Sequence, residues 1–358
     1  MKFIHTADLH IDSKMESNLS SAKAKERKAE LLHTFGRLAA YAAANNVTAV
    51  IIAGDMFDSP RATQRARNHI IDVIRSTPNV DFLYLAGNHD EGVFEGELPP
   101  NLKSFGEDWT YFEYGDVTIA GARLGSDTGI YDRLKLSDSR VNIVAMHGQE
   151  SNYSGGRDGA ETVNLSALRS RYIDYLALGH VHSFKAGELD KRGVWCYSGC
   201  LEGRGFDECG DKGFVVLETA KGKPVKAEFV PFAGRKLFEV EVDITGLTAV
   251  SQIEAKADDA LAKVDKGSLI KLCLAGTYTE DTQKDIKRYV EELNNRFYFA
   301  KAGDDRSRLA INIADYKDDV SLKGEFIRLV LAADGLGQTQ TDTVICYGIN
   351  ALRGEDID

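Results

Sequence analysis

The chain has 358 residues, of which 43% are hydrophobic and 28% are charged, as in soluble globular proteins, and its length suggests two domains. No run approaches the ~20 apolar residues of a membrane-spanning helix, no apolar signal core follows Lys2, and the five cysteines contain no C-x-x-C pair, so we expect a reduced, cytoplasmic protein with no membrane contact. The formal net charge of −11 argues against a protein that coats nucleic acid through its overall field, but not against a nuclease, because bound divalent cations make a site locally positive.

The first half of the chain alternates apolar strands with amphipathic helices. Predicted helices span residues 22–45 and 61–76, and the predicted strands are 2–7, 47–53, 80–86, 117–122, 141–146 and 173–178. These strands are continuously apolar rather than alternating, so we expect their sheets to be covered on both faces. Shorter strands with glycine-rich turns follow over 194–230. The pattern predicts an α/β domain.

A change of pattern near Pro231 predicts a second, smaller α+β domain. The expected order is strand 237–244, helix 249–264, strand 268–275, helix 282–295, strand 309–313 and helix 322–333. None of the eight histidines lies in this part of the chain. We therefore expect domains at 1–231 and 232–358, with the chemistry in the first.

Five short motifs rich in histidine and aspartate each follow the end of a predicted strand. They are Asp8-Leu9-His10, Gly54-Asp55-Met56-Phe57-Asp58, Gly87-Asn88-His89-Asp90, His147-Gly148 and Gly179-His180-Val181-His182. Carboxylate and amide oxygens combined with imidazole nitrogens suit Mn²⁺, Fe²⁺ or Zn²⁺ rather than Ca²⁺. The glycines allow sharp turns and leave space for ions. The motifs therefore predict a pair of divalent metal ions that cleaves phosphate esters.

In their order and spacing, the five motifs resemble those of the calcineurin-like metallophosphoesterases over roughly residues 1–220. The resemblance implies a four-layer α/β sandwich of two mixed β-sheets flanked by helices. It implies that one metal ion is held by Asp8, His10, Asp55 and His182, and the other by Asp55, Asn88, His147 and His180. It further implies a bridging hydroxide that attacks phosphorus, with His89 as the acid to the leaving group and Asp90 orienting His89.

Two segments narrow the resemblance to the SbcD/YhaO-like DNA repair exonucleases. They are the opening 3–10 and the stretch 197–208 with Lys212-Gly213 after it, and the second domain is similar to the DNA-capping domain of that group. The resemblance implies a DNA substrate, a preference for Mn²⁺, an SbcC-like ATPase partner and a homodimer. Arginines near the motifs are expected to contact DNA phosphates: Arg61, Arg65, Arg67, Arg157 and Arg204. No long linker followed by amphipathic helices is visible before Asp358, which argues against binding of that partner through the C-terminal helical segment of the group.

Two other functions compete with the nuclease. The first is a small-molecule phosphodiesterase or phosphatase on the same scaffold. The second is a regulatory subunit of an SbcC-like ATPase, with a purely structural metal site. His89 argues against the second, because a structural site does not require a histidine that binds no metal.

Overall fold

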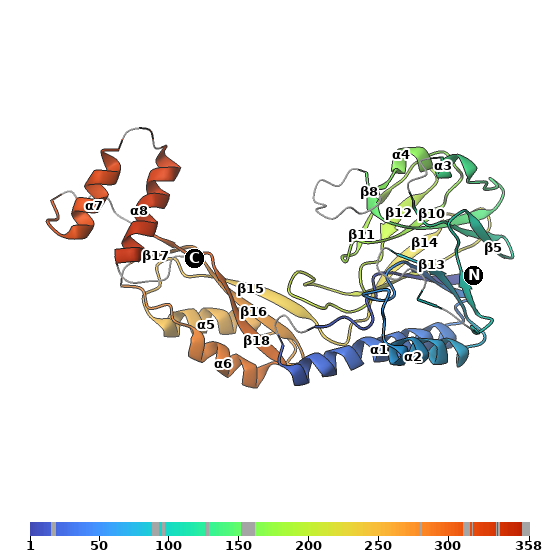
Figure 1. Ribbon diagram of the computed structural model, residues 1–358, viewed down its shortest axis with the longest axis horizontal. Coiled ribbons are helices and arrows are strands. Elements are labelled where there is room, and N and C mark those ends of the chain that lie inside the picture. Colours follow the sequence, from blue (N-terminus) through green and yellow to red (C-terminus); the bar gives the residue numbers. More distant parts are fainter. Residues whose placement is uncertain are drawn as a thin grey trace. The chain divides into compact units, whose positions relative to one another are not determined.

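The computed structural model describes residues 1–15, 19–87, 93–94, 97–125, 129–151, 162–279, 281–310, 316, 318–333, 335 and 337–352. The chain forms two compact units, Met1–Leu237 and Phe238–Asp358 (Figure 1). The predicted boundary, after residue 231, falls at the end of strand β14 (Lys226–Pro231), and the two units divide six residues later, after Leu237. Each unit has its own apolar core.

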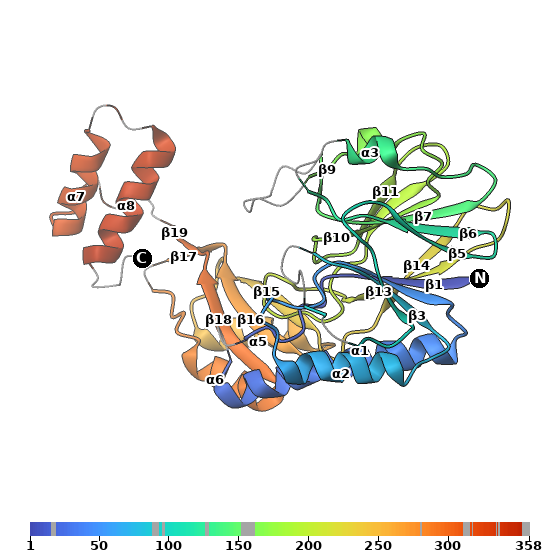
Figure 2. The same cartoon turned by 45° about the vertical axis from the view of Figure 1, so that its right-hand side comes forward.

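Unit 1 contains two six-stranded mixed sheets (Figures 1 and 2). The first has the order β14-β13-β1-β2-β3-β4, and its other strands are β1 (Lys2–Thr6), β2 (Ala49–Ala53), β3 (Asp81–Leu85), β4 (Leu102–Ser104) and β13 (Gly213–Glu218). The second has the order β11-β12-β10-β7-β6-β5, with β5 (Thr110–Tyr114), β6 (Val117–Gly121), β7 (Val141–His147), β10 (Tyr175–Gly179), β11 (Lys185–Glu188) and β12 (Val194–Tyr197). In both sheets four adjacent strands are parallel, β1 to β4 and β6-β7-β10-β12, so their carboxyl ends share one edge.

The two sheets pack face to face, and helices cover their outer faces. In β2, Val50 and Ile52 pack with α1 (Ser21–Ala44) and α2 (Gln64–Arg75), whereas Ile51 packs with the second sheet. The short helices α3 (Ile130–Arg133) and α4 (Leu165–Leu168) pack on the other side of the second sheet. This arrangement explains the continuously apolar strands and confirms the predicted four-layer α/β sandwich. A two-stranded ribbon, β8 (Gln149–Glu150) with β9 (Thr162–Val163), follows β7.

Unit 2 is an α+β unit built on a three-stranded sheet of order β15-β16-β18. Its strands are β15 (Leu237–Asp243), β16 (Leu269–Ala275) and β18 (Phe299–Asp305), and α5 (Val250–Leu261) and α6 (Lys287–Arg296) share their core. Beyond the short pair β17 (Thr277–Tyr278) and β19 (Arg308–Leu309), the helices α7 (Leu322–Leu331) and α8 (Gln338–Leu352) pack against each other (Figure 1).

Two elements of unit 2 differ from the sequence prediction. Strand β18 was not predicted, and of the strand predicted over 309–313 only Leu309 is in β19, while residues 311–313 lie outside the described residues. Helix α8 was not predicted either, because the sequence prediction ended with the helix over 322–333. Within the described residues, no helix combines the length and apolarity needed to span a bilayer.

Candidate metal centre

The carboxyl ends of neighbouring parallel strands bring the predicted ligands together. Strand β1 leads to Asp8 and His10, β2 leads to Asp55, and β7 ends on His147. The loops after β1 and β2 run side by side, because the Asp8 N–H donates to the Gly54 carbonyl at 3.1 Å and the His10 N–H donates to the Asp55 carbonyl at 3.0 Å. The fold therefore explains how residues far apart in the sequence come to share one site.

Several predicted ligands have a left-handed backbone, which is unfavourable for residues other than glycine. The φ angles are 52° for Asp8, 42° for His10, 50° for Asp55 and 106° for His180. Each such residue costs on the order of 1–3 kcal/mol, and such strain clusters at functional sites. Four strained residues at the ends of three strands indicate that this edge of the sandwich is shaped for function.

Glycines leave the space that the ligand side chains occupy. A Cβ on Gly54 would lie 2.0 Å from Nδ1 of His147, and a Cβ on Gly179 would lie 1.9 Å from the Ala53 carbonyl oxygen. A Cβ on Gly87 would lie 2.1 Å from Oδ1 of Asp55. A side chain at any of these three positions would collide with a neighbouring residue of the site, so glycine is required there for space as well as for the turns.

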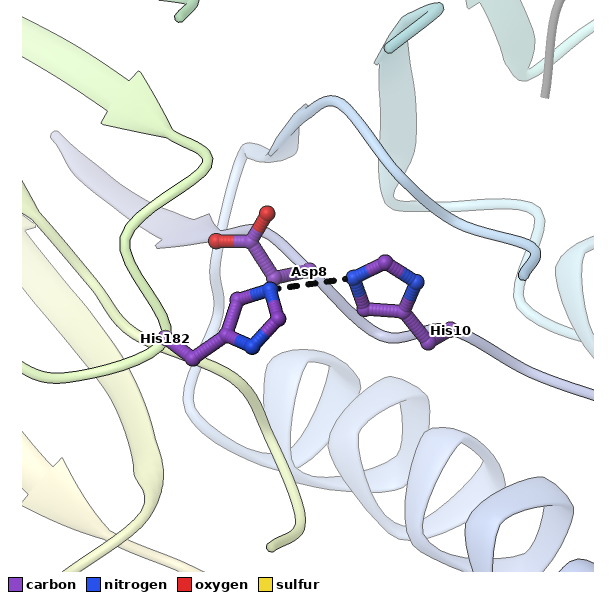
Figure 3. Close-up of side chains that lie close together, drawn as sticks. All are labelled: Asp8, His10 and His182. Carbon is purple, nitrogen blue, oxygen red and sulfur yellow. Dashed lines mark hydrogen bonds between the residues drawn. The ribbon is translucent and has the colours of Figure 1, made fainter. Parts of the chain in front are cut away.

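The first cluster consists of Asp8, His10 and His182 (Figure 3). The two imidazole rings meet edge-on, with their Nε2 atoms 3.2 Å apart and the Asp8 carboxylate beside them. His10 Nε2 also lies 3.7 Å from Oδ2 of Asp55. Asp8 is fully buried and accepts the backbone N–H of His180 at 2.9 Å. Buried carboxylate and imidazole acceptors that converge in this way are typical of a cation site.

The second cluster consists of Asp8, Asp55 and His147. Nδ1 of His147 must carry the hydrogen, because it lies 2.9 Å from the Ala53 carbonyl oxygen, which can only accept. In the neutral ring, the form that binds a metal ion, the Nε2 atom therefore presents its lone pair, and it lies 3.3 Å from Oδ2 of Asp55. Two acceptors this close require a proton or a metal ion between them, so the donor set fits a divalent cation.

The carboxylates of the site favour positive charge on two of its histidines, His147 and His182. Burial alone would lower the pKa of His147, but the hydrogen bond and charge of Asp55 raise that pKa to about 9. Burial also acts to lower the pKa of His182, yet Glu208 and Asp8 raise it overall. In His180, burial and the charge of His147 lower the pKa. A divalent cation would take advantage of the same carboxylate field.

The remaining predicted ligands lie at the margin of these clusters or outside the described residues. His180 belongs to neither cluster, but its ring meets the ring of His147 edge-on, with centroids 5.7 Å apart. Asn88, His89 and Asp90 lie outside the described residues, directly after Gly87. Their assignment to metal binding and proton transfer stays a prediction.

Two carboxylates that were not predicted as site residues contact the outer nitrogens of the first cluster. Glu208 is buried, and its Oε1 accepts from Nδ1 of His182 at 2.7 Å. Oδ1 of Asp58 lies 3.2 Å from Nδ1 of His10. Burial opposes ionisation of Glu208, but hydrogen bonds from His182 and Arg204 lower its pKa well below the ordinary value. Both carboxylates lie in the segments quoted above, Asp58 in the second motif and Glu208 in 197–208, but their role could not be predicted from these patterns.

The arginines expected to contact DNA have different environments. Arg61 and Arg65 are exposed, Arg65 in the first turn of α2 and Arg61 just before it, and Arg67 is half-buried. Arg204 is largely buried and bonded to Glu208 and Asp58. Arg157 lies outside the described residues.

The chain is similar in sequence to known proteins. The family model described as calcineurin-like phosphoesterase matches residues 1–184. The chain is 26% identical to the metallophosphoesterase YhaO of Bacillus subtilis, over 78% of this chain and 73% of that protein. It is 25% identical to the DNA double-strand break repair protein Mre11 of Sulfolobus acidocaldarius, over 99% of this chain and 96% of that protein. A solved dimetal phosphatase from Danio rerio has a TM-score of 0.40 and 13% identity, covering 61% of this chain and 92% of that one.

Proposed function

The chain belongs to the calcineurin-like phosphoesterase family, and from this membership we propose that it is a two-metal phosphodiesterase that cleaves DNA. The observation that carries the proposal is the convergence of two groups of ligands that share Asp8. Two divalent cations at this site, Mn²⁺ by preference and Fe²⁺ or Zn²⁺ as alternatives, would polarise the phosphate and activate water.

The protein's own residues would orient the phosphodiester and transfer the proton. Asp8, His10, Asp55 and His182 are proposed to hold one ion, and Asp55, Asn88, His147 and His180 the other. His89 is proposed to donate a proton to the leaving oxygen, and Asp90 to orient His89. The metal ions would not protonate the leaving oxygen. His89 would supply that proton, because the leaving alkoxide must be protonated as its bond to phosphorus breaks.

DNA as the substrate is supported by similarity along the whole chain to a DNA double-strand break repair protein. The exposed Arg61 and Arg65 stand on the segment that follows the Asp55 motif, and Arg157 follows the His147 motif. Phosphate contacts of this kind position nucleic acid without reading its sequence. Unit 2, which contains none of the predicted ligands, is proposed to help hold the duplex.

Exposed apolar side chains on the last two helices support a protein partner. Leu322 and Leu329 on α7 and Tyr347 on α8 are exposed to 70%, 64% and 49%, whereas Ile345 and Ile349 are buried in the unit 2 core. Exposed apolar side chains on two helices that pack against each other are typical of a binding surface. We propose that an SbcC-like ATPase binds these two helices. A homodimer is proposed as well, and sedimentation of the protein alone tests it.

The experiment that tests the function is cleavage of end-labelled duplex and hairpin DNA with Mn²⁺, beside bis-p-nitrophenyl phosphate, for wild type and His89→Ala. We expect wild type to cut both substrates. His89→Ala should bind both ions but cleave DNA about 10²–10⁴-fold more slowly, as when a general acid is lost. Cleavage of the small diester alone would contradict the DNA substrate, and loss of both ions from His89→Ala would contradict the role of His89.

A further inference from the structure

We propose that Arg204 is a positioning residue for the first metal position, the one formed by Asp8, His10 and His182. This inference rests on the metal assignment of the proposed function but not on the DNA substrate. Arg204 joins Asp58 and Glu208, the carboxylates that contact the outer nitrogens of His10 and His182, and we call these three residues the Arg204 bridge.

The contacts of the Arg204 bridge form a closed path around the two histidines. Nη1 of Arg204 donates to Oδ1 of Asp58 at 2.9 Å, and Nη2 donates to Oε1 of Glu208 at 2.6 Å. Oε2 of Glu208 also accepts the backbone N–H of Arg204 at 2.7 Å. Because the two Nε2 atoms of the histidines lie 3.2 Å apart on the inner side, the path runs from carboxylate to imidazole to imidazole to carboxylate and back through Arg204.

Glu208 fixes the tautomer of His182 as well as its orientation. The carboxylate accepts from Arg204 through both of its oxygens, Oε1 from Nη2 at 2.6 Å and Oε2 from the backbone N–H at 2.7 Å. It can therefore only accept, and Nδ1 of His182 carries the hydrogen while Nε2 presents its lone pair inward. Carboxylates in this outer position orient metal-binding histidines and increase their basicity.

The planar guanidinium explains why an arginine is required. Its two terminal nitrogens point in fixed directions and can bind two carboxylates at once, whereas a lysine ammonium is a single point charge on a flexible stem. Asp58 follows β2 and contacts His10, whereas Glu208 lies in the segment between β12 and β13 and binds His182. Arg204 therefore links the two carboxylates that contact the two histidines. Loss of this link would free both rings to turn.

The carbonyl of His182 is held independently of its ring. Nζ of the buried Lys212 donates to this oxygen at 2.7 Å, and the Cys200 N–H donates to it at 3.3 Å. A change at Arg204 should therefore loosen the ring of His182 without releasing its backbone. The consequence to be measured is weaker metal binding at one position rather than a general loss of structure.

The burial of Arg204 separates this role from a contact with DNA. Its side chain is 18% exposed and already bonded to two carboxylates, whereas Arg65 is exposed on α2. A phosphate contact would require Arg204 to give up part of the bridge. Arg204 and Arg65 should therefore affect different measurements.

The test is a Mn²⁺ titration of the full chain, with free Mn²⁺ followed by electron paramagnetic resonance, for wild type, Arg204→Met, Arg204→Lys and Arg65→Met. In Arg204→Met we expect one of two ions to bind about 10–100-fold more weakly, the usual effect of losing an outer partner of a metal ligand, while the other ion keeps its affinity. Arg204→Lys should recover part of the loss, because it can pair with one carboxylate. Arg65→Met should bind both ions like wild type.

Several outcomes would overturn the role of Arg204. Wild-type affinity for both ions in Arg204→Met, with weaker DNA binding, would make Arg204 a phosphate contact instead. Equal weakening of both ions together with a lower melting temperature of the metal-free protein would indicate a merely structural role. If Arg204→Met does not fold, Asp58→Asn removes one end of the bridge from a half-exposed position, and an unchanged Mn²⁺ titration in that variant contradicts the proposal. Failure of wild type to cut DNA would refute only the substrate, because the titration contains no DNA.

Discussion

Gly87 has no room for a side chain, because a Cβ there would lie 2.1 Å from Oδ1 and 2.5 Å from the backbone nitrogen of Asp55. We predict that Gly87→Ala shifts Asp55 and lowers kcat/KM for bis-p-nitrophenyl phosphate by on the order of 10²-fold, the effect of a displacement of about 1 Å at a catalytic group. Gly36→Ala in α1 is the matched control, since nothing lies within 4 Å of its Cβ position. That variant should keep its activity and gain roughly 1 kcal/mol of stability. Wild-type kinetics in Gly87→Ala would contradict the prediction.

His5 joins the two sheets of the sandwich inside the core. It lies on β1, and its Nδ1 is 2.9 Å from the hydroxyl of Tyr175 on β10, with both residues fully buried. Burial lowers the pKa of His5 to about 3 from the 6.5 of an exposed histidine. The unfolded chain therefore binds a proton between these values and the folded chain does not, so the stability from the neutral imidazole is complete above pH 6.5 and is lost as the pH falls toward 3.

We predict that metal-free wild type loses about 3 kcal/mol more stability between pH 7 and pH 4 than a variant without this histidine. The comparison variant is His5→Leu with Tyr175→Phe, which removes both partners of the hydrogen bond and leaves no buried hydroxyl unpaired. Urea unfolding at the two pH values, in the presence of chelator, gives the difference. Equal losses in the two proteins would show that His5 does not cause the acid sensitivity.

Helix α1 is attached to the loop of the metal centre by a buried ion pair. Arg27 is 1% exposed, and its Nη2 donates to the Gly203 carbonyl at 2.8 Å and lies 3.6 Å from Oε2 of Glu202. Oε1 of Glu202 accepts from the Thr34 hydroxyl at 2.7 Å and from the Gly234 N–H at 2.6 Å. The helix therefore supports the segment that continues into Arg204.

We predict that Arg27→Met destabilises the protein by about 3–5 kcal/mol, because it leaves the carboxylate of Glu202 buried without its cation. Adding Glu202→Gln should recover part of this loss, since the second change removes the uncompensated charge. Chemical unfolding of the two variants and wild type measures both steps. A double variant no more stable than Arg27→Met would mean that packing of the arginine side chain, rather than charge, causes the effect.

The elements that could be predicted from the sequence are those with strong apolar patterns. Strands such as β2 and β7 are continuous apolar runs, and periodicity alone located them to within a few residues. Strand β18 contains Gly303, Asp304 and Asp305, and its pairing with β16 rather than its own composition makes it a strand. Helix α8 is rich in threonine, valine and isoleucine, which favour strands, and packing against α7 and the unit 2 core overrides that preference.

At the candidate metal centre, short motifs predicted three residues that lie together: Asp8 and Asp55 follow β1 and β2, and His147 ends β7 of the second sheet. The surroundings of these ligands could not be predicted. Glu208 comes from a loop whose path depends on the tertiary fold, and the burial of Arg204 depends on the same path. Sequence reasoning therefore predicted Arg204 as a DNA contact and did not predict that it bridges two carboxylates.

The division of the molecule into two units gives the last prediction. Both ligand clusters, the Arg204 bridge and both six-stranded sheets lie within Met1–Leu237. We predict that a chain ending at residue 237 binds two Mn²⁺ ions and cleaves bis-p-nitrophenyl phosphate like the full chain. Its cleavage of duplex DNA should fall by on the order of 10²-fold, as when one of two linked binding surfaces is removed.

The ratio of the two activities separates the contribution of unit 2 from any damage to the centre. A simple diester contacts only the centre, so its kcat/KM reports whether the shortened chain still folds there, while duplex DNA also requires the binding surface. A fall in the duplex activity alone assigns the holding of DNA to Phe238–Asp358. Equal falls in both activities would mean that unit 2 supports the fold of unit 1. Unchanged cleavage of duplex DNA would mean that unit 2 does not bind the substrate and would favour a role in binding a partner protein.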